Sequence, residues 1–197
     1  MAMPTRKEQP EQGKKPLRVE VLMAGIGGKG VLFAGQLLAD SAVDRYPHVA
    51  WFPSYATQMR GGPCECTTVI SETPIATPVL FTAETVIVMV VSQLSSYLGR
   101  VAPGGLLITE SVGLKDGITR DDIRVMKVPA FQTALDTGGG QAANLVLLGA
   151  YLGASGTIPP ELVEEGLRKK TSRWGDTFNR NRDAFRRGIE LGAAQKV

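Results

Sequence analysis

The chain alternates between short apolar runs and longer amphipathic segments, beginning near residue 17. Residues 17–24 are apolar with little polar interruption, which is typical of a strand buried on both faces. Residues 25–30 are rich in glycine and predict a turn. Residues 31–44 place their apolar side chains at helical spacing. The chain is therefore expected to open with a strand, a turn and a helix in succession.

The same alternation continues toward the C-terminus. Further strands are predicted over 49–52, 64–71, 85–91, 106–110 and 124–128, and the segment 85–91 is the best candidate for a central strand. Further helices are predicted over 92–100, 130–136, 142–153, 161–170 and 176–191. Ser92 is the predicted N-cap of the first of these helices. Strands that alternate with helices indicate an α/β fold. We expect a Rossmann-like, three-layer α/β/α sandwich with a largely parallel or mixed sheet.

Composition fits one folded unit behind a polar tail. Residues 1–16 are charged and polar and contain three prolines, Pro4, Pro10 and Pro16, which predicts a flexible tail. The remaining segment, 17–197, is long enough for one sizeable core, and hydrophobic residues make up 43% of the chain. We therefore expect a single domain over 17–197.

Charge and hydropathy narrow the class of partners. A formal net charge of +3 is too weak to indicate nucleic acid. Basic residues gather over 168–187, where a solvated helix face is the simpler interpretation and a docking or anion-facing patch the alternative. The apolar stretch 86–91 is far shorter than a membrane span, and no secretory signal is visible. A soluble, cytoplasmic protein without a membrane partner is expected.

Groups that commonly perform catalysis are scarce. Cys64 and Cys66 lie two apart on a predicted strand, so they face the same side, as small core or interface residues or as a strained disulfide or half a metal site. Two thiols cannot supply the ligands of a structural zinc or an ordinary iron–sulfur cluster. His48 is the only histidine, and no nucleophile or carboxylate pair accompanies it. We expect no catalytic residue and no metal site on this chain.

The turn over 25–30 is the first candidate binding segment. Gly25, Gly27 and Gly30 match the glycine spacing of dinucleotide-binding turns, and such a turn brings helix N–H groups close to an anion. Gly28 adds to the flexibility of the turn, and Lys29 adds a positive charge. The acid that normally binds the ribose is missing after the second strand, and Asp44 falls before that strand. A phosphate-bearing ligand and simple close packing of helix on strand remain as alternatives.

A second candidate segment follows the strand over 49–52. Tyr55, Arg60, Gly61 and Gly62 lie in a predicted loop at a strand end, where α/β proteins place many ligand contacts. An arginine beside two glycines is free to present its guanidinium group to a carboxylate or phosphate. An ordinary surface arginine in a flexible loop is the equally weighted alternative.

Together these segments resemble the gamma subunit of 2-oxoacid:ferredoxin (acceptor) oxidoreductases. The resemblance begins with the glycine turn 25–31 and continues through the Pro-Ser-Tyr of 53–55 and the Met-Arg-Gly-Gly of 59–62. It extends over nearly the whole chain after the tail. Its further parts, which occur in the family's order and spacing, are 68–71, 74–75, Pro78, 103–105, Asn144, 148–150, Asn181, Ala184 and Gly188.

The resemblance implies a role inside a complex. Members of this family oxidatively decarboxylate a 2-oxoacid to an acyl-CoA and CO2 and pass electrons to ferredoxin. Thiamine diphosphate, Mg²⁺ and iron–sulfur clusters are expected on alpha, beta and ferredoxin-like delta partners, while the isolated gamma chain is inactive. The residues that the resemblance suggests for contacts with coenzyme A or the alpha chain are Gly25, Gly27, Gly28, Lys29, Gly30, Tyr55, Arg60, Gly61 and Gly62.

The substrate and two other functions remain open at this point. The Arg60-Gly61-Gly62 sequence resembles the 2-oxoglutarate and branched-chain branches of the family, and 2-oxoglutarate is the favoured substrate. A stand-alone nucleotide- or CoA-binding module without redox chemistry is the main alternative. A self-contained NAD-dependent dehydrogenase is disfavoured because the ribose-binding acid and catalytic residues are missing.

Overall fold

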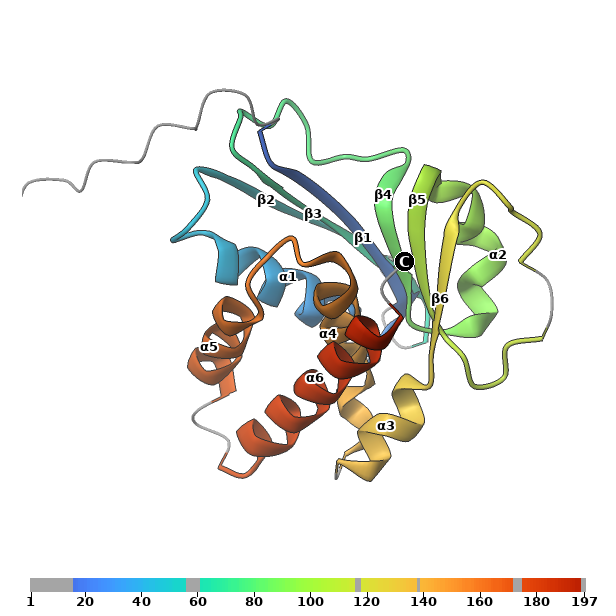
Figure 1. The fold of residues 1–197 in the computed structure, drawn as a ribbon, viewed down its shortest axis with the longest axis vertical. Coiled ribbons are helices and arrows are strands. Elements are labelled where there is room, and N and C mark those ends of the chain that lie inside the picture. The colour runs from blue at the N-terminus through green and yellow to red at the C-terminus, as the bar shows by residue number, and fades with distance from the viewer. Residues whose placement is uncertain (1–15, 56–60, 116–117, 138, 172–174, 196–197) are drawn as a thin grey trace, which may run out of the picture.

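A six-stranded sheet forms the centre of the molecule (Figure 1). The computed structural model describes residues 16–55, 61–115, 118–137, 139–171 and 175–195. The strands lie side by side in the order β2-β3-β1-β4-β5-β6. Their bounds are β1 Arg18–Ile26, β2 His48–Tyr55, β3 Pro63–Ser71, β4 Ala83–Val88, β5 Val101–Glu110 and β6 Arg124–Val128.

The sheet is mixed, with one strand opposed to the rest. Strands β1, β4, β5 and β6 pair in parallel, whereas β3 is antiparallel to both of its neighbours, β1 and β2. The expected α/β fold with a largely parallel or mixed sheet is confirmed. Strand β3 lies between β1 and β2, so the first two strands are not neighbours. In the Rossmann dinucleotide-binding domain, by contrast, the first two strands are neighbours.

Helices cover the two faces of the sheet unequally, as Figure 1 shows. On one face a large core joins the inner sides of α1, α3, α4, α5 and α6 to the sheet. On the other face a small core packs against the short α2 and its flanking turns and includes the buried Tyr97. The bounds are α1 Val31–Ala42, α2 Leu94–Tyr97, α3 Ala130–Asp136, α4 Ala143–Ser155, α5 Pro160–Thr171 and α6 Thr177–Ala194.

The predicted boundaries differ from the structure around β4 and β5. Strand β4 ends at Val88 rather than at residue 91, because Gln93 N–H donates to the carbonyl of Val90 and closes a 3₁₀ turn there. Ser92 lies inside that turn and is not the N-cap of a helix. Strand β5 begins at Val101 rather than at residue 106, and residues 102–105 form a bulge within it. Each difference arises where a neighbouring strand or turn supplies the partners for the backbone hydrogen bonds.

Helices α4 and α6 pack backbone against backbone. A Cβ atom added at Gly188 would lie 2.1 Å from the carbonyl oxygen of Val146, and one at Gly192 would lie 2.0 Å from that of Ala150. The reverse contacts are equally close, because added Cβ atoms at Gly149 and Gly153 would lie 2.2 Å from carbonyl oxygens of α6. Each helix therefore has two glycines four residues apart, and these glycines allow the two helix backbones to touch.

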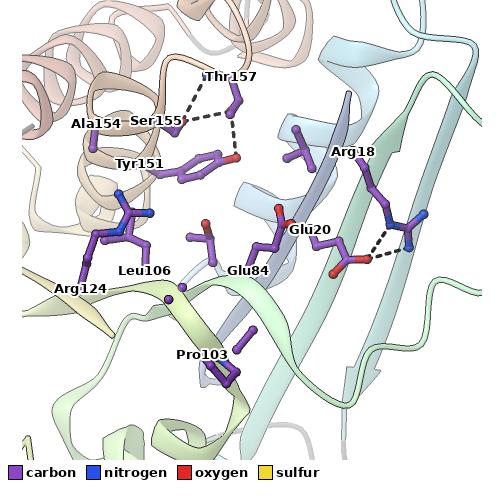
Figure 2. Close-up of a pocket in the computed structure, with 15 residues that line it drawn as sticks. Arg18, Glu20, Glu84, Pro103, Leu106, Arg124, Tyr151, Ala154, Ser155 and Thr157 are labelled. Carbon is purple, nitrogen blue, oxygen red and sulfur yellow. Dashed lines mark hydrogen bonds and ion pairs between the residues drawn. The ribbon is translucent and has the colours of Figure 1, made fainter. Parts of the chain in front are cut away.

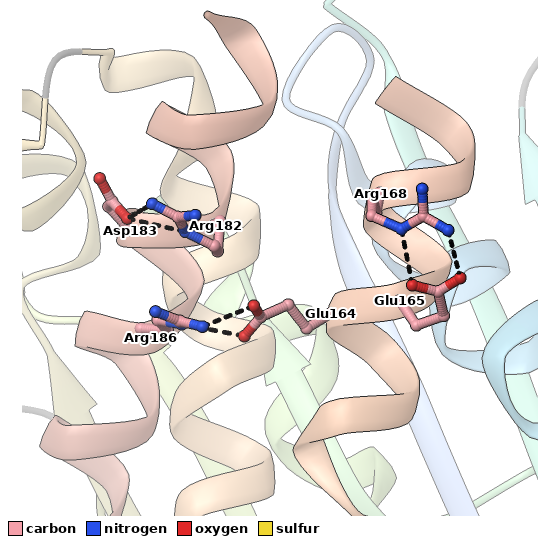
Figure 3. Close-up of polar contacts among 6 residues, drawn as sticks. All are labelled: Glu164, Glu165, Arg168, Arg182, Asp183 and Arg186. Carbon is pink, nitrogen blue, oxygen red and sulfur yellow. Dashed lines mark hydrogen bonds and ion pairs between the residues drawn. The ribbon is translucent and has the colours of Figure 1, made fainter. Parts of the chain in front are cut away.

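Three of the basic residues over 168–187, Arg168, Arg182 and Arg186, form ion pairs on the outside of α5 and α6 (Figure 3). Arg168 pairs with Glu165 within α5, and Arg186 pairs with Glu164 across the two helices, each at 2.7 Å. These side chains are about half exposed, apart from the more buried Glu164. Exposed pairs of this kind contribute about 0–1 kcal/mol each. The arrangement agrees with the interpretation of a solvated helix face.

Within the described ranges, every helix is either too short or too polar to cross a bilayer.

Candidate functional site

The two glycine-rich segments meet at the edge of the sheet where the parallel strands end. Strand β1 ends at Ile26 and α1 begins at Val31, so the first segment is the turn between them. The amide N–H of Gly27 donates to the carbonyl oxygen of Gly62 at 2.8 Å. Although 35 positions separate these residues, the antiparallel pairing of β1 with β3 brings them together. The edge of the sheet thus carries both predicted binding segments.

The second segment is described only in part. Tyr55 is the last residue of β2 and pairs with Cys64 of β3, which in turn pairs with Gly25 of β1. The backbone of Tyr55 therefore ends on the same edge as the glycine turn. Arg60 lies outside the described residues. Gly61 is exposed beside Gly62 at the start of β3.

The N-termini of two helices converge on this turn. Gly30 is the N-cap of α1, and its carbonyl oxygen accepts a hydrogen bond from Nδ2 of Asn144 at 3.0 Å. Asn144 lies in the first turn of α4, and neither helix has an acidic residue in its first turn. Helix N-termini carry partial positive charge and unpaired N–H groups. With the exposed Lys29 beside them, they form an arrangement suited to an anion.

Close packing accounts for the first glycine of the fingerprint, and a backbone hydrogen bond occupies the N–H of the second. An added Cβ at Gly25 would lie 2.9 Å from Cγ2 of Val31, so this glycine lets the helix start directly against the strand. The N–H of Gly27 is already bonded to Gly62 and is not free for a phosphate. Asp44 lies in the turn that follows α1. The residues present do not form the ribose-binding end of a dinucleotide site.

Helix α1 is held on β3 by side chains that bond its backbone. The thiol of Cys66 lies 3.6 Å from the carbonyl oxygen of Val31, and Oγ1 of Thr68 donates to that of Gly35 at 3.0 Å. A Cβ at Gly35 would lie 2.3 Å from Sγ of Cys66, so a larger residue would push the helix away. These contacts fix the N-terminus of α1 relative to the sheet.

The cysteines are free and buried, as expected for core residues. They face the helix side of the sheet, next to α1. His48 begins β2 opposite Ser71, at the far end of that strand from Tyr55. Among the described residues, no group of three or more His, Cys, Asp or Glu side chains is placed to hold a metal ion.

Burial of Cys66 predicts a loss of stability in alkali. Burial raises the pKa of its thiol from 9.0 to about 12. Above pH 9 the unfolded chain therefore releases a proton that the folded chain retains, so stability falls as the pH rises toward 12. At pH 10 this contribution is on the order of 1 kcal/mol. Between pH 8 and pH 10, the free energy of unfolding measured with urea should decrease less for Cys66→Ser than for the unaltered chain. Equal decreases would contradict the assignment of this pH dependence to Cys66.

Two residues at this edge had not been expected from the sequence as parts of a site. Asn144 is only 6% exposed, and it links α4 to the glycine turn. Glu110 ends β5 and accepts backbone hydrogen bonds from Val112 and Phe131, each at 2.8 Å, which fixes the start of α3. Asn144 follows the glycine run 138–140 by four positions and belongs to the family pattern, but neither observation indicates a contact with the turn. Glu110 gives no local signal, because Phe131 is 21 positions away.

Comparison with protein families gives one match over most of the chain. Residues 20–191 match the family described as pyruvate ferredoxin/flavodoxin oxidoreductase.

Two curated relatives are 34% and 30% identical to this chain over the aligned residues. It is 34% identical over 152 residues to the ketoisovalerate oxidoreductase subunit VorA of Methanothermobacter marburgensis, covering 76% of this chain but 30% of VorA. It is 30% identical over 183 residues to the 2-oxoglutarate synthase subunit KorC of Methanothermobacter thermautotrophicus, covering 89% of this chain and 95% of KorC. The chain thus spans about a third of the length of VorA and nearly all of KorC.

Solved structures share the fold. The gamma subunit of a keto/oxoacid ferredoxin oxidoreductase from Geobacter sulfurreducens is 27% identical, with a TM-score of 0.75 over 91% of this chain and 99% of that chain. The 2-oxoglutarate:ferredoxin oxidoreductase from Magnetococcus marinus, with 2-oxoglutarate, coenzyme A and succinyl-CoA bound, is 20% identical. Its TM-score is 0.84 over 93% of this chain and 32% of that chain. At 20% identity this second likeness is one of fold.

Proposed function

Because the chain belongs to the pyruvate ferredoxin/flavodoxin oxidoreductase family, we propose that it is the gamma subunit of a CoA-dependent 2-oxoacid:ferredoxin oxidoreductase. The proposed complex oxidatively decarboxylates a 2-oxoacid to an acyl-CoA and CO2, with electrons passed to ferredoxin. The family match over residues 20–191 is the observation that carries this proposal. The likeness to KorC along nearly its whole length supports a separate subunit formed by one gamma-type domain over 17–197.

The redox chemistry is assigned to partner subunits. Thiamine diphosphate, Mg²⁺ and iron–sulfur clusters would be held by alpha, beta and ferredoxin-like delta chains. This chain would instead supply a surface and an anion-binding edge. The likeness to VorA supports the assignment of the chemistry to other parts of the complex. In VorA, the segment similar to this chain belongs to a chain about three times as long.

The glycine edge is the proposed contact for the phosphates of coenzyme A or for the alpha chain. Its helix N-termini at Gly30 and Asn144, together with Lys29, favour negative charge. Arg60 would add a guanidinium group beside Gly61 and Gly62. The Magnetococcus protein, which shares the fold, contains coenzyme A, and this supports a CoA-dependent reaction here.

We favour 2-oxoglutarate as the substrate, with a branched-chain 2-oxoacid as the second candidate. The first rests on KorC, which matches along 95% of its length, and the second on VorA, which has the higher identity. The relative from Pyrococcus abyssi is a gamma subunit common to pyruvate and ketoisovalerate oxidoreductases and is 27% identical. That one gamma subunit serves two oxidoreductases supports substrate choice by the other subunits.

Co-purification tests the assignment to a complex. The tagged full chain, isolated from its own cells without oxygen, is expected to bring alpha and beta partners with bound thiamine diphosphate. The complex should reduce ferredoxin only when coenzyme A and one 2-oxoacid are both present. A panel of 2-oxoglutarate, pyruvate and 3-methyl-2-oxobutanoate then identifies the substrate. A chain that purifies alone and binds a nucleotide would favour the stand-alone binding module.

Loss of the positive charges should weaken use of coenzyme A. In the complex, Lys29→Ala and Arg60→Ala are each expected to raise the KM for coenzyme A about tenfold, the effect of one charge-assisted hydrogen bond. The KM for the 2-oxoacid should remain unchanged. Lys169→Ala, which removes an exposed charge from α5, is the matched control. An unchanged KM for coenzyme A in both variants would exclude these contacts.

A further inference from the structure

A cavity lies at the opposite edge of the sheet from the glycine turn (Figure 2). It has a volume of about 480 Å³ and lies where the parallel strands begin, against the C-terminal end of α4. Its walls come from the first residues of β1, β4, β5 and β6 and from the end of α4 with Thr157. Ligand sites of small molecules commonly have volumes of about 300–1,000 Å³, so this cavity has room for a metabolite.

An irregular stretch of β5 forms one wall and leaves room beside it. Between two regular pairs of residues, β4 contributes only Glu84, whereas β5 contributes the four residues 102–105. These four residues are small, and an added Cβ at Gly105 would lie 2.7 Å from the carbonyl oxygen of Ala102. Bulges that interrupt a strand are frequent next to functional sites, where they redirect the backbone. This bulge lines the cavity with backbone rather than with bulky side chains.

A cluster of three hydroxyl groups at the end of α4 forms the opposite wall. The phenol of Tyr151 and the hydroxyl of Ser155 each lie 3.0 Å from Oγ1 of Thr157, as Figure 2 shows. Three hydroxyls carry three protons, and the two bonds within the cluster use two of them. One O–H donor and several lone pairs therefore remain for a ligand. Because Tyr151 is only 1% exposed, the packing around its ring holds the cluster in place.

The hydroxyl group of Thr85 adds an unpaired polar group to the cavity. Thr85 lines the cavity and is 8% exposed, and its hydroxyl has no hydrogen-bond partner within the described residues. It lies two residues before Ile87, which belongs to the large core, so its side chain is on the face of the sheet that α4 covers. A buried hydroxyl without a partner costs free energy, so such groups are rare in folded proteins. This hydroxyl therefore marks a position that a ligand can fill.

The charged side chains around the cavity leave its neutral groups as the elements that recognise a ligand. Arg18 is paired with Glu20 at 2.6 Å, which neutralises both charges. Arg124 already takes part in an interaction within the protein, so the site does not depend on it. Glu84 is exposed, and water and salt screen its charge. The hydroxyl of Thr85 and the hydroxyl cluster therefore decide which ligand fits.

Each of these hydroxyls can both donate and accept a hydrogen bond, so they suit a ligand whose own groups do the same. An ammonium group only donates and a carboxylate only accepts, so either would leave part of the site unpaired. We propose that this cavity binds a small neutral polyol, a compound such as a sugar that carries hydroxyl groups on adjacent carbons. One ligand hydroxyl bonds Thr85, and another bonds the cluster of Tyr151, Ser155 and Thr157.

Binding measurements with matched analogues test the proposal. Ligand-detected NMR on the full chain would use glycerol, D-ribose and D-glucose at about 10 mM, a concentration that detects millimolar affinities. For the polyol that binds, two analogues are then measured, in which an ammonium or a carboxylate group replaces a hydroxyl or hydroxymethyl group. For glycerol these are 3-amino-1,2-propanediol and glycerate. We expect each analogue to bind at least about fivefold more weakly, because each loses one matched hydrogen bond.

Variants locate the binding. Thr85→Val and Tyr151→Phe each remove one hydroxyl group and should each weaken binding about fivefold. Thr77→Val, at an exposed position outside the cavity, is the matched control and should bind normally. Because the hydroxyl of Thr85 has no partner among the described residues, Thr85→Val should not lower the melting temperature.

Several results would overturn the proposal. They are absence of binding by all three polyols, equal or tighter binding of a charged analogue, and full binding by Thr85→Val or by Tyr151→Phe. A lower melting temperature of Thr85→Val would mean that its hydroxyl is already satisfied within the protein, and this result would also overturn the proposal. The NMR readout requires no turnover, so it stands apart from the test of the proposed oxidoreductase.

Discussion

Replacement of Gly188 by alanine is expected to lower the free energy of unfolding by about 3 kcal/mol, the upper part of the range for overpacked sites. The added methyl carbon would lie 2.1 Å from the carbonyl oxygen of Val146 and 2.9 Å from its backbone carbons. Because the obstacle is helix backbone, it cannot rotate away as a side chain would. The two helices must separate, which opens a gap along the rest of their contact.

Urea unfolding with a second glycine variant isolates this effect. Gly99→Ala is the control, because a Cβ atom there meets nothing within 4 Å and Gly99 lies in a helical turn. In such an open position alanine stabilises by about 0.4–1 kcal/mol, since it restricts the unfolded chain. The two substitutions are chemically identical and should act in opposite directions. Equal effects would mean that the helices do not touch at Gly188.

The contact between α4 and α6 matters because α4 reaches both ends of the sheet. Asn144 lies at its start and bonds the glycine turn, while Tyr151 lies two turns later and lines a cavity of about 480 Å³ at the end where the parallel strands begin. Gly149 and Gly153, between and after them, face the backbone of α6. The position of α4 is therefore set by α6, and the geometry at both edges of the sheet depends on this one helix pair.

Local patterns predicted most elements but not the way in which they pair. Strands β1 and β6 and the helices α1, α3 and α4 follow apolar periodicity that is complete within each segment. The bulge over 102–105 depends on β4, which pairs across it, so no window of the chain could reveal it. The antiparallel insertion of β3 between β1 and β2 depends likewise on long-range pairing. Topology is thus the part that sequence periodicity leaves undetermined.

The candidate site shows the same division. The glycine turn was predicted because a strand, glycines and a helix follow one another directly. The hydrogen bond from Asn144 to Gly30 joins residues 114 positions apart and has no local signature. The glycine pairs of α4 and α6 lie four residues apart in the sequence, yet glycine within a helix usually argues against that helix. Their meaning emerges only when both helices are seen in contact.

Replacement of Gly30 by alanine should destabilise the glycine edge through two separable causes. Gly30 has φ of 75°, a conformation that costs an alanine about 1–2 kcal/mol. An added Cβ would also lie 2.4 Å from Nδ2 of Asn144 and displace the side chain that bonds the turn. The sum is about 2–3 kcal/mol, since a lost buried hydrogen bond adds about 1 kcal/mol. Urea unfolding measures the total.

Two further variants separate the conformational and steric contributions to this loss of stability and connect them to the proposed function. Gly28→Ala carries the same conformational cost, because Gly28 has φ of 88°, but its Cβ would meet nothing within 4 Å. The expected decrease in the free energy of unfolding for Gly28→Ala is therefore only about 1–2 kcal/mol. In an Asn144→Ala background, Gly30→Ala should fall to that smaller value, because the obstructing amide is gone. If Gly30→Ala costs no more than Gly28→Ala in the unaltered chain, Asn144 does not hold the turn. The convergence of the two helix N-termini would then lose its structural support as an anion site.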